Sequence, residues 1–385
     1  MAAVGALAIA AAALLRPVRF PVPGGPHRVG TALRHWRDPE RAELLAPGEG
    51  RIRELPAQIW YPTATTSGER ARYLPDAPLV LAALLQALRV VTDGRTAPPA
   101  VLFRKLTATR ARAILEAPPL AGRTFPAVVA LSGFGGFPTA STALIEELVS
   151  WGLVVVAIDQ PYVSARARLA DGTAATMLAR GSLYEGRSRE EVHAHLVADA
   201  SAALDALGDD PLLAPVVDTR RSGVMGVSLG GTIPAVAARA DSRFAACLML
   251  DATMPPGVAA EGIPAAALWL TRPADDMRRE RRRAGGWPEE VIAETHGSMV
   301  SALAAQAPGT GRIVRVRGMH HIDFTDAPRW FPWARWVGWS GRIGHRRAHR
   351  IVAALASRFL VRELGGRGAA RPGCDPPRPG VGGAP

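Results

Sequence analysis

The chain has 385 residues, enough for one large domain or two small ones, and its 48% hydrophobic and 21% charged residues are typical of a globular protein. Its net charge is +12, carried almost wholly by arginine, because Lys105 is the only lysine. No basic run alternates with aromatic residues as in a nucleic-acid groove, so we expect a solvated arginine-rich surface and no nucleic-acid partner. The two cysteines do not indicate a disulfide framework, and zinc-binding spacings are absent from the sequence.

An uncharged, alanine-rich apolar run covers residues 2–15 and ends at Arg16. It is shorter than the roughly 18 residues of a spanning helix and lacks the basic start of a typical signal peptide. An export signal, the stub of a membrane anchor and a loose helix all fit, and we favour a membrane-associated or exported protein over a cytoplasmic one. The predicted division is an N-terminal segment (1–16), a main domain (17–364) and a disordered Gly/Pro/Arg tail (365–385).

Beyond this run, strand-like and helix-like stretches alternate. Residues 20–50 are rich in Pro, Gly and Arg, which predicts irregular surface structure. Strands are expected at 57–61, 125–131, 153–158, just before Ser228, and at 245–250, 265–270 and 312–316. Helices are expected at 79–91, 143–150, 190–207 and 349–364, with a charged, largely helical stretch over 272–306. Such alternation predicts an α/β fold, a mostly parallel sheet with helices on both faces and working residues at the carboxyl ends of its strands.

The stretch from Ser222 to Thr232 organises the chain. It contains Gly226-Val227-Ser228-Leu229-Gly230, the G-x-S-x-G pattern of a nucleophile elbow, in which a strand turns sharply into a helix. The turn strains its central residue and leaves no room for side chains two positions away. We therefore expect Ser228 to be a nucleophile, with the free N–H groups of the next helix behind it.

A glycine-rich loop follows the expected strand at 125–131 and reads Ser132-Gly133-Phe134-Gly135-Gly136-Phe137. Acyl transfer develops a negative oxygen, which backbone N–H groups placed in advance can hold. In the elbow architecture one such donor follows the nucleophile and the other comes from an earlier loop. Leu229 and Phe134 are the candidates for this oxyanion hole.

A histidine after the last strand would complete the order Ser, acid, His. Either His320 or His321 suits the role of the base that takes the serine proton, and the residues alone do not choose between them. For the acid, Asp251 follows one strand, while Asp275 and Asp276 follow the next. The commonest arrangement favours Asp276. Asp323 and Asp326 lie too close in sequence to the histidines to be a first choice.

Several ordered motifs are shared with one family. They are Gln58-Ile59-Trp60-Tyr61-Pro62, Tyr73-Leu74-Pro75-Asp76-Ala77, the loop 132–137, Gly226 to Gly231, Leu250-Asp251-Ala252 and His321-Ile322-Asp323-Phe324-Thr325-Asp326. Through them, the chain from about residue 29 to residue 364 resembles the plasma-type platelet-activating factor acetylhydrolases and their bacterial relatives, which are α/β-hydrolases.

The resemblance implies an α/β-hydrolase fold with catalytic Ser228, Asp251 and His321, and an oxyanion hole at Phe134 and Leu229. It implies a serine carboxylic ester hydrolase that needs no metal or cofactor and acts on short-chain or oxidised acyl esters, with phospholipid as a candidate substrate. Two departures, Val227 and Ser132 where members often carry histidine, leave substrate preference open. The alternatives are a general carboxylesterase or polyester hydrolase and, less favoured, a non-catalytic binding protein.

Four tryptophans recur at every third position, at Trp330, Trp333, Trp336 and Trp339. One interpretation is a patch that contacts a membrane surface. The other, which we favour, is an aromatic wall that packs the last helix onto the core.

Overall fold

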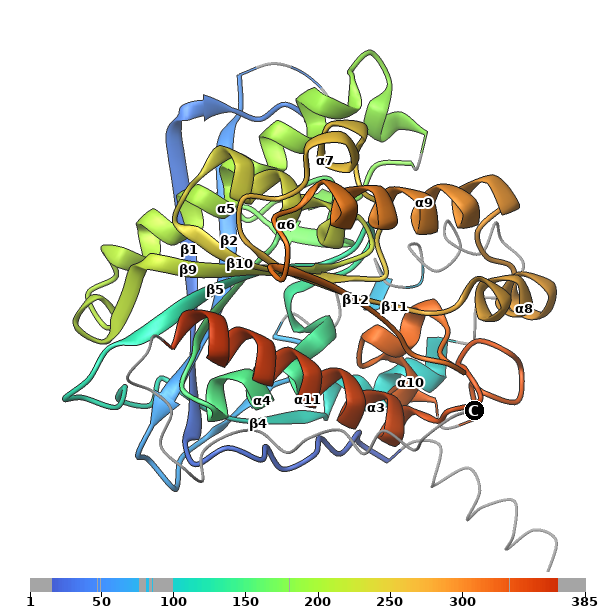
Figure 1. Ribbon diagram of the computed structural model, residues 1–385. Coiled ribbons are helices and arrows are strands. Elements are labelled where there is room, and N and C mark those ends of the chain that lie inside the picture. The colour runs from blue at the N-terminus through green and yellow to red at the C-terminus, as the bar shows by residue number, and fades with distance from the viewer. Residues whose placement is uncertain are drawn as a thin grey trace, which may run out of the picture.

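The computed structural model describes residues 16–365, except 47, 49, 76–80, 83–84, 86–99, 180 and 332 (Figure 1). The apolar run 2–15, almost all of the helix expected at 79–91 and the tail beyond Gly365 lie outside the described residues. The division of the chain at 16 and 365 therefore stays a prediction.

A ten-stranded sheet in the order β12-β11-β10-β9-β5-β6-β2-β1-β4-β3 forms the centre of the described structure. From β12 to β6 the neighbouring strands are parallel, whereas β2 pairs antiparallel with both β6 and β1. The strands are β1 (Arg28–Ala42), β2 (Ile52–Thr63), β3 (Arg70–Arg72), β4 (Arg110–Leu115), β5 (Phe125–Leu131), β6 (Val154–Ile158), β9 (Val217–Val227), β10 (Phe244–Leu250), β11 (Ala266–Thr271) and β12 (Gly311–Arg315). A separate hairpin joins β7 (Arg166–Arg168) and β8 (Ala174–Thr176).

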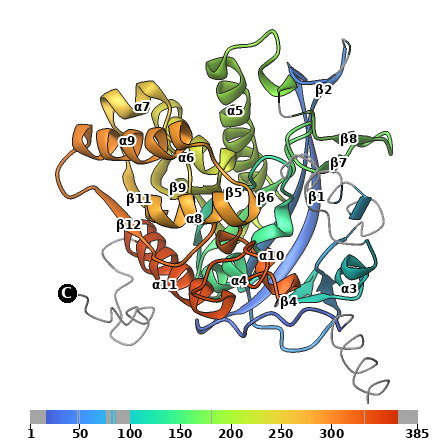
Figure 2. The same ribbon diagram turned by 90° about the vertical axis from the view of Figure 1, so that its right-hand side faces the viewer.

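Helices cover both faces of this sheet (Figures 1 and 2). On one face lie α5 (Arg189–Gly208), α6 (Leu229–Ala240), α7 (Pro256–Glu261) and α9 (Glu289–Ala305), and on the other lie α4 (Thr142–Ser150) and α11 (His345–Leu364). The helices α3 (Arg104–Thr107), α8 (Ala274–Ala284) and α10 (Ala327–Trp330) lie beyond the sheet ends. This confirms the predicted α/β fold with a mostly parallel sheet.

The central strands are continuous apolar runs because both of their faces are buried. Val129 of β5 and Val156 of β6 belong to the core cluster that includes α5 and α6. Their neighbours Val128 and Val155 belong to the opposite cluster, which includes α4 and α11. Side chains that alternate along one strand thus fill two separate cores.

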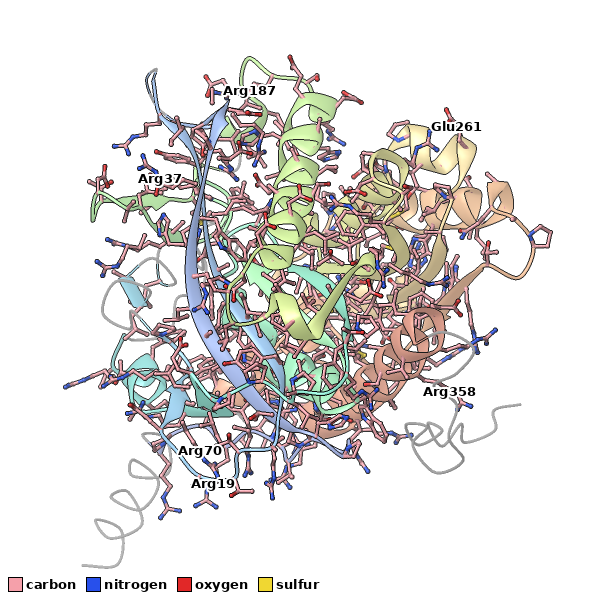
Figure 3. All side chains as sticks on the ribbon, turned by 90° about the vertical axis from the view of Figure 1, so that its left-hand side faces the viewer. Arg19, Arg37, Arg70, Arg187, Glu261 and Arg358 are labelled. Carbon is pink, nitrogen blue, oxygen red and sulfur yellow. The ribbon has the colours of Figure 1, made fainter. Side chains whose placement is uncertain are left out.

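The expectation of irregular structure over residues 20–50 is wrong for residues 28–42. β1 occupies Arg28–Ala42 and pairs with β2 along most of its length. Its pairing shifts between Asp38 and Ala42, where Pro39 lies, because proline has no N–H to donate to the ladder. The polar and turn-forming residues of this stretch do not predict a strand, which forms because β2 lies beside it. Figure 3 shows the two strands as long blue ribbons side by side.

The aromatic stretch divides between core and surface. Trp330 and Phe331 are buried with Tyr73, Phe103 and Phe137, so this wall packs against the segments near α3 rather than against the last helix. Trp336, by contrast, is 68% exposed.

Arginine side chains project from well-separated parts of the molecule. Figure 3 labels Arg19, Arg37, Arg70, Arg187 and Arg358 at separate places in one view of the molecule.

Candidate active site

Ser228 occupies a strained turn between β9 and α6. Its backbone has φ 58° and ψ −124°, which is rare for a residue with a side chain. A Cβ atom on Gly226 would overlap the carbonyl oxygen of Gly230, and one on Gly230 would overlap the carbonyl oxygen of Ser132. The two glycines are therefore required by close backbone contacts, which is why the local sequence makes this turn. The Ser228 N–H donates to the carbonyl of Leu250 at 3.0 Å, which fixes the turn to the end of β10.

The glycine-rich loop after β5 lies directly against Ser228. A Cβ atom on Gly133 would be 3.1 Å from the Cβ of Ser228. The loop is held by two backbone hydrogen bonds to the segment after β6, from Gly135 N to Val163 O at 2.9 Å and from Ala165 N to Gly136 O at 2.7 Å. It is thus a fixed feature beside the predicted nucleophile.

The two predicted oxyanion donors have no acceptor within the described part of the chain. Leu229 is the first residue of α6, where an N–H has no intrahelical partner. The N–H of Phe134 likewise forms no hydrogen bond with a described residue. Both groups are available to a ligand, as an oxyanion hole requires.

His321 and Asp251 are in direct contact. His321 lies in a 3-10 turn (His321–Phe324) after β12, and its Nδ1 is 2.7 Å from Asp251 Oδ2. Asp251 directly follows β10, is 1% exposed and has φ 49°. The strand order puts Ser228 at the end of the neighbouring β9, so Ser228 and the contacting pair Asp251 and His321 follow strands that end at the same edge of the sheet. Among the described residues no hydrogen bond joins the Ser228 hydroxyl to the His321 ring, a contact that in many hydrolases tightens only with substrate.

The other candidate residues have different partners. His320 is 3% exposed, and its Nδ1 lies 2.9 Å from the carbonyl of Gly338. Asp276 is the third residue of α8; it accepts the Gly318 N–H at 2.7 Å and an Arg279 hydrogen bond at 2.6 Å. Three further acids have partners other than the imidazole of His321. They are Asp323, which accepts from Ser340 and the backbone of Gly341, Asp326, which accepts from Ala143, and Asp275, which pairs with Arg278.

Four residues of this site were not anticipated. Thr271 Oγ1 donates to Asp251 Oδ1 at 2.8 Å, and Arg272 Nε donates to Asp251 Oδ2 at 2.7 Å. Glu280 on α8 pairs with Arg272, and its carboxylate oxygens also accept from the backbone N–H of His321 at 3.4 Å. Trp287 lies against both the His321 ring, at 4.9 Å between centroids, and the Arg272 guanidinium, 5.1 Å from its ring.

These contacts fix the ionisation of Asp251. Burial by itself would raise the pKa of its carboxyl, but Arg272, His321 and Thr271 outweigh burial and hold that pKa well below its usual range. Asp251 is therefore a carboxylate at neutral pH. A buried carboxylate in contact with an imidazole selects its tautomer and stabilises the imidazolium form.

The sequence carried only a weak signal for the unexpected residues. Thr271 and Arg272 directly follow a predicted strand, the position where working residues gather. Glu280 belongs to an arginine-rich run whose sequence predicts a solvated helix face. The Glu280 side chain is buried only because of the way α8 packs. Figures 1 and 2 both show α8 between α9 and α10, beyond the end of β11.

Comparisons with known proteins agree with the fold. No protein-family model and no curated protein matches the chain. Among solved structures, a ferulic acid esterase from Streptomyces cinnamoneus is similar over 94% of this chain and 96% of its own, at 27% identity and a TM-score of 0.68. The likeness supports an α/β-hydrolase fold and a carboxylic ester hydrolase in general, and it does not extend to the platelet-activating factor acetylhydrolases in particular.

No group of three His, Cys, Asp or Glu side chains among the described residues is arranged to hold a metal ion. No described helix is both long enough and apolar enough to cross a bilayer.

Proposed function

We propose that the protein is a serine carboxylic ester hydrolase with Ser228 as nucleophile, His321 as base and Asp251 as acid. The observation that carries this proposal is the 2.7 Å contact between His321 Nδ1 and Asp251 Oδ2, at the sheet edge that also holds the strained Ser228 turn. A nucleophile, a base and a group that orients the base are the parts that acyl transfer needs.

The reaction follows from these positions. The His321 Nε2 accepts the Ser228 proton as the hydroxyl oxygen attacks the ester carbonyl carbon, and Asp251 stabilises the imidazolium that forms. The N–H groups of Phe134 and Leu229 hold the negative oxygen of the tetrahedral intermediate. His321 then gives its proton to the departing alcohol, and a water molecule releases the acyl group from Ser228 by the same sequence.

Two classes of substrate deserve testing. The family resemblance of the motifs favours short-chain or oxidised acyl esters, including phospholipids such as platelet-activating factor. The likeness to a ferulic acid esterase favours a second candidate, esters of a phenolic acid. A panel of p-nitrophenyl esters of graded chain length, a short-chain phospholipid and methyl ferulate, compared by kcat/KM, separates these candidates from each other and from a general carboxylesterase.

We also propose a membrane surface as the place where a lipid substrate is met. Trp336 and Val337 are 68% and 47% exposed, and the Arg335 guanidinium lies 5.3 Å from the Trp336 ring. An exposed aromatic side chain beside cations suits a lipid headgroup region. Sedimentation with anionic vesicles is expected to fall for Trp336→Ala, and equal sedimentation of both proteins would contradict the proposal.

Labelling with a fluorophosphonate probe tests the nucleophile directly. The parent protein and a Ser201→Ala control on α5 are expected to be labelled and to hydrolyse p-nitrophenyl acetate, while Ser228→Ala is expected to do neither. An unlabelled parent would instead support a non-catalytic binding protein. Labelling that persists in Ser228→Ala would refute the nucleophile assignment.

A further inference from the structure

Arg272 occupies an unusual place for a cation. It directly follows β11, the strand end at which the commonest arrangement of this fold carries its acid. Its side chain is only 1% exposed. Guanidinium groups are seldom buried, and those that are need charged partners. Both of its partners are carboxylates of the candidate site, Asp251 on one side and Glu280 on the other.

The guanidinium and the imidazole share one oxygen atom. Arg272 Nε and His321 Nδ1 each lie 2.7 Å from Asp251 Oδ2, while Thr271 occupies Oδ1. Three donors therefore fix the carboxylate in one orientation. The two nitrogens on Oδ2 are at most about 5.4 Å apart, within the distance over which one charge shifts the titration of another.

The charges around His321 act in opposite directions. Asp251 contacts the ring of His321 and Glu280 contacts its backbone N–H, and both are negative, whereas Arg272, which shares Asp251 Oδ2 with the ring, is positive. From α9, His296 interacts electrostatically with both Asp251 and Arg272, and burial and nearby arginines lower its pKa, which keeps it neutral at neutral pH. Trp287 covers the guanidinium and the imidazole from the third side and carries no charge.

We propose that Arg272 is a positioning residue that holds Asp251 in place at the end of β10 and, by its charge, sets the pH range in which His321 works as a base. This role rests on the proposed function. Arg272 takes no part in proton transfer and touches neither the substrate nor the reacting atoms. Its partner Glu280 anchors the guanidinium and offsets part of its effect on the imidazole.

Two single variants with opposite predicted signs test the proposal. Arg272→Met removes a positive charge beside His321, so the acid limb of the kcat/KM profile is expected to move up by about one pH unit or more. We expect kcat to fall about 10- to 100-fold, with KM changed less than about twofold, because the loss concerns the orientation of Asp251. Glu280→Gln removes a negative charge, so its acid limb is expected to move to lower pH.

Two controls make the result specific. Arg278→Met, on the exposed side of α8, should leave the pH profile unchanged, because Arg278 pairs with Asp275 and Glu289 and not with Asp251. Arg272→Lys, which keeps the charge, should restore the parent pH profile more fully than the parent kcat. If Arg272→Met fails to fold, Glu280→Gln and Arg272→Lys still decide the question.

A measurement that needs no activity separates this proposal from the proposed function. In a Ser228→Ala background, the His321 ring can be titrated by NMR. The midpoint of this titration is expected to move to higher pH in Arg272→Met and to lower pH in Glu280→Gln. Titration curves and acid limbs that coincide with the parent in both variants would overturn the role of Arg272. A dead enzyme whose imidazole still shifts in this way would overturn the proposed function alone.

Discussion

Replacing Asp251 by asparagine is the sharpest test of which carboxylate serves His321. The change keeps the shape of the side chain and removes its charge. Asp251 Oδ2 accepts from both Arg272 and His321, whereas an amide nitrogen at this place would face two donors. If the amide were flipped, its nitrogen would face the Thr271 hydroxyl, and its carbonyl oxygen would accept from Arg272 and His321.

The expected loss follows from these contacts. Without the carboxylate, the imidazolium loses its stabilising partner, and the imidazole is free to adopt the unproductive tautomer. A loss of about 10⁴-fold in kcat, or about 5 kcal/mol in the barrier, is the expected scale. The Arg272 guanidinium would also keep only one of its two buried carboxylates, so a cost of about 3 kcal/mol in the free energy of unfolding is expected.

Asp276→Asn is the matched control. Asp276 is also buried and follows the next strand, but its partners are Arg279 and the Gly318 N–H. Hydrolysis of p-nitrophenyl acetate by folded protein, checked by circular dichroism and urea unfolding, should fall less than about tenfold in this variant. If Asp276→Asn loses more kcat than Asp251→Asn, the assignment of the acid is wrong.

Three further changes test other parts of the structure. Gly133→Ala would put a methyl group 3.1 Å from Ser228 Cβ, so kcat/KM should fall about tenfold with little change in melting temperature, and an unchanged rate would contradict a close-fitting loop. Burial raises the pKa of Glu146 to about 8, so its folded-state proton makes stability fall by about 1.4 kcal/mol per pH unit between roughly pH 5 and pH 8. Glu146→Gln should remove this slope in urea unfolding, and parallel curves for the two proteins would refute the buried proton. Trp330→Ala should cost about 3–5 kcal/mol in the free energy of unfolding, against less than about 0.5 kcal/mol for the exposed Trp336→Ala, and similar costs would contradict the division of the aromatic stretch.

The sequence alone was enough to predict the α/β fold and the Ser228 turn, because both depend on local requirements. The strands at 125–131, 153–158 and 245–250 are apolar on both faces. Such strands lie in the centre of a sheet that is covered on both sides. The turn at Ser228 needs glycine at 226 because a Cβ atom there would overlap the carbonyl of Gly230 within the same segment, whereas glycine at 230 is needed because the loop after β5 lies against it.

Only the tertiary structure decided which side chains meet. Asp251 and Asp276 both follow strands, and their local patterns do not differ; the packing of α8 directs Asp276 toward Gly318 and leaves Asp251 facing His321. Likewise, β1 is a strand because β2 lies beside it, and Arg272 is buried because carboxylates from β10 and α8 surround it. Such contacts join residues far apart in the chain and depend on the registers of several elements at once, which no short stretch of sequence specifies.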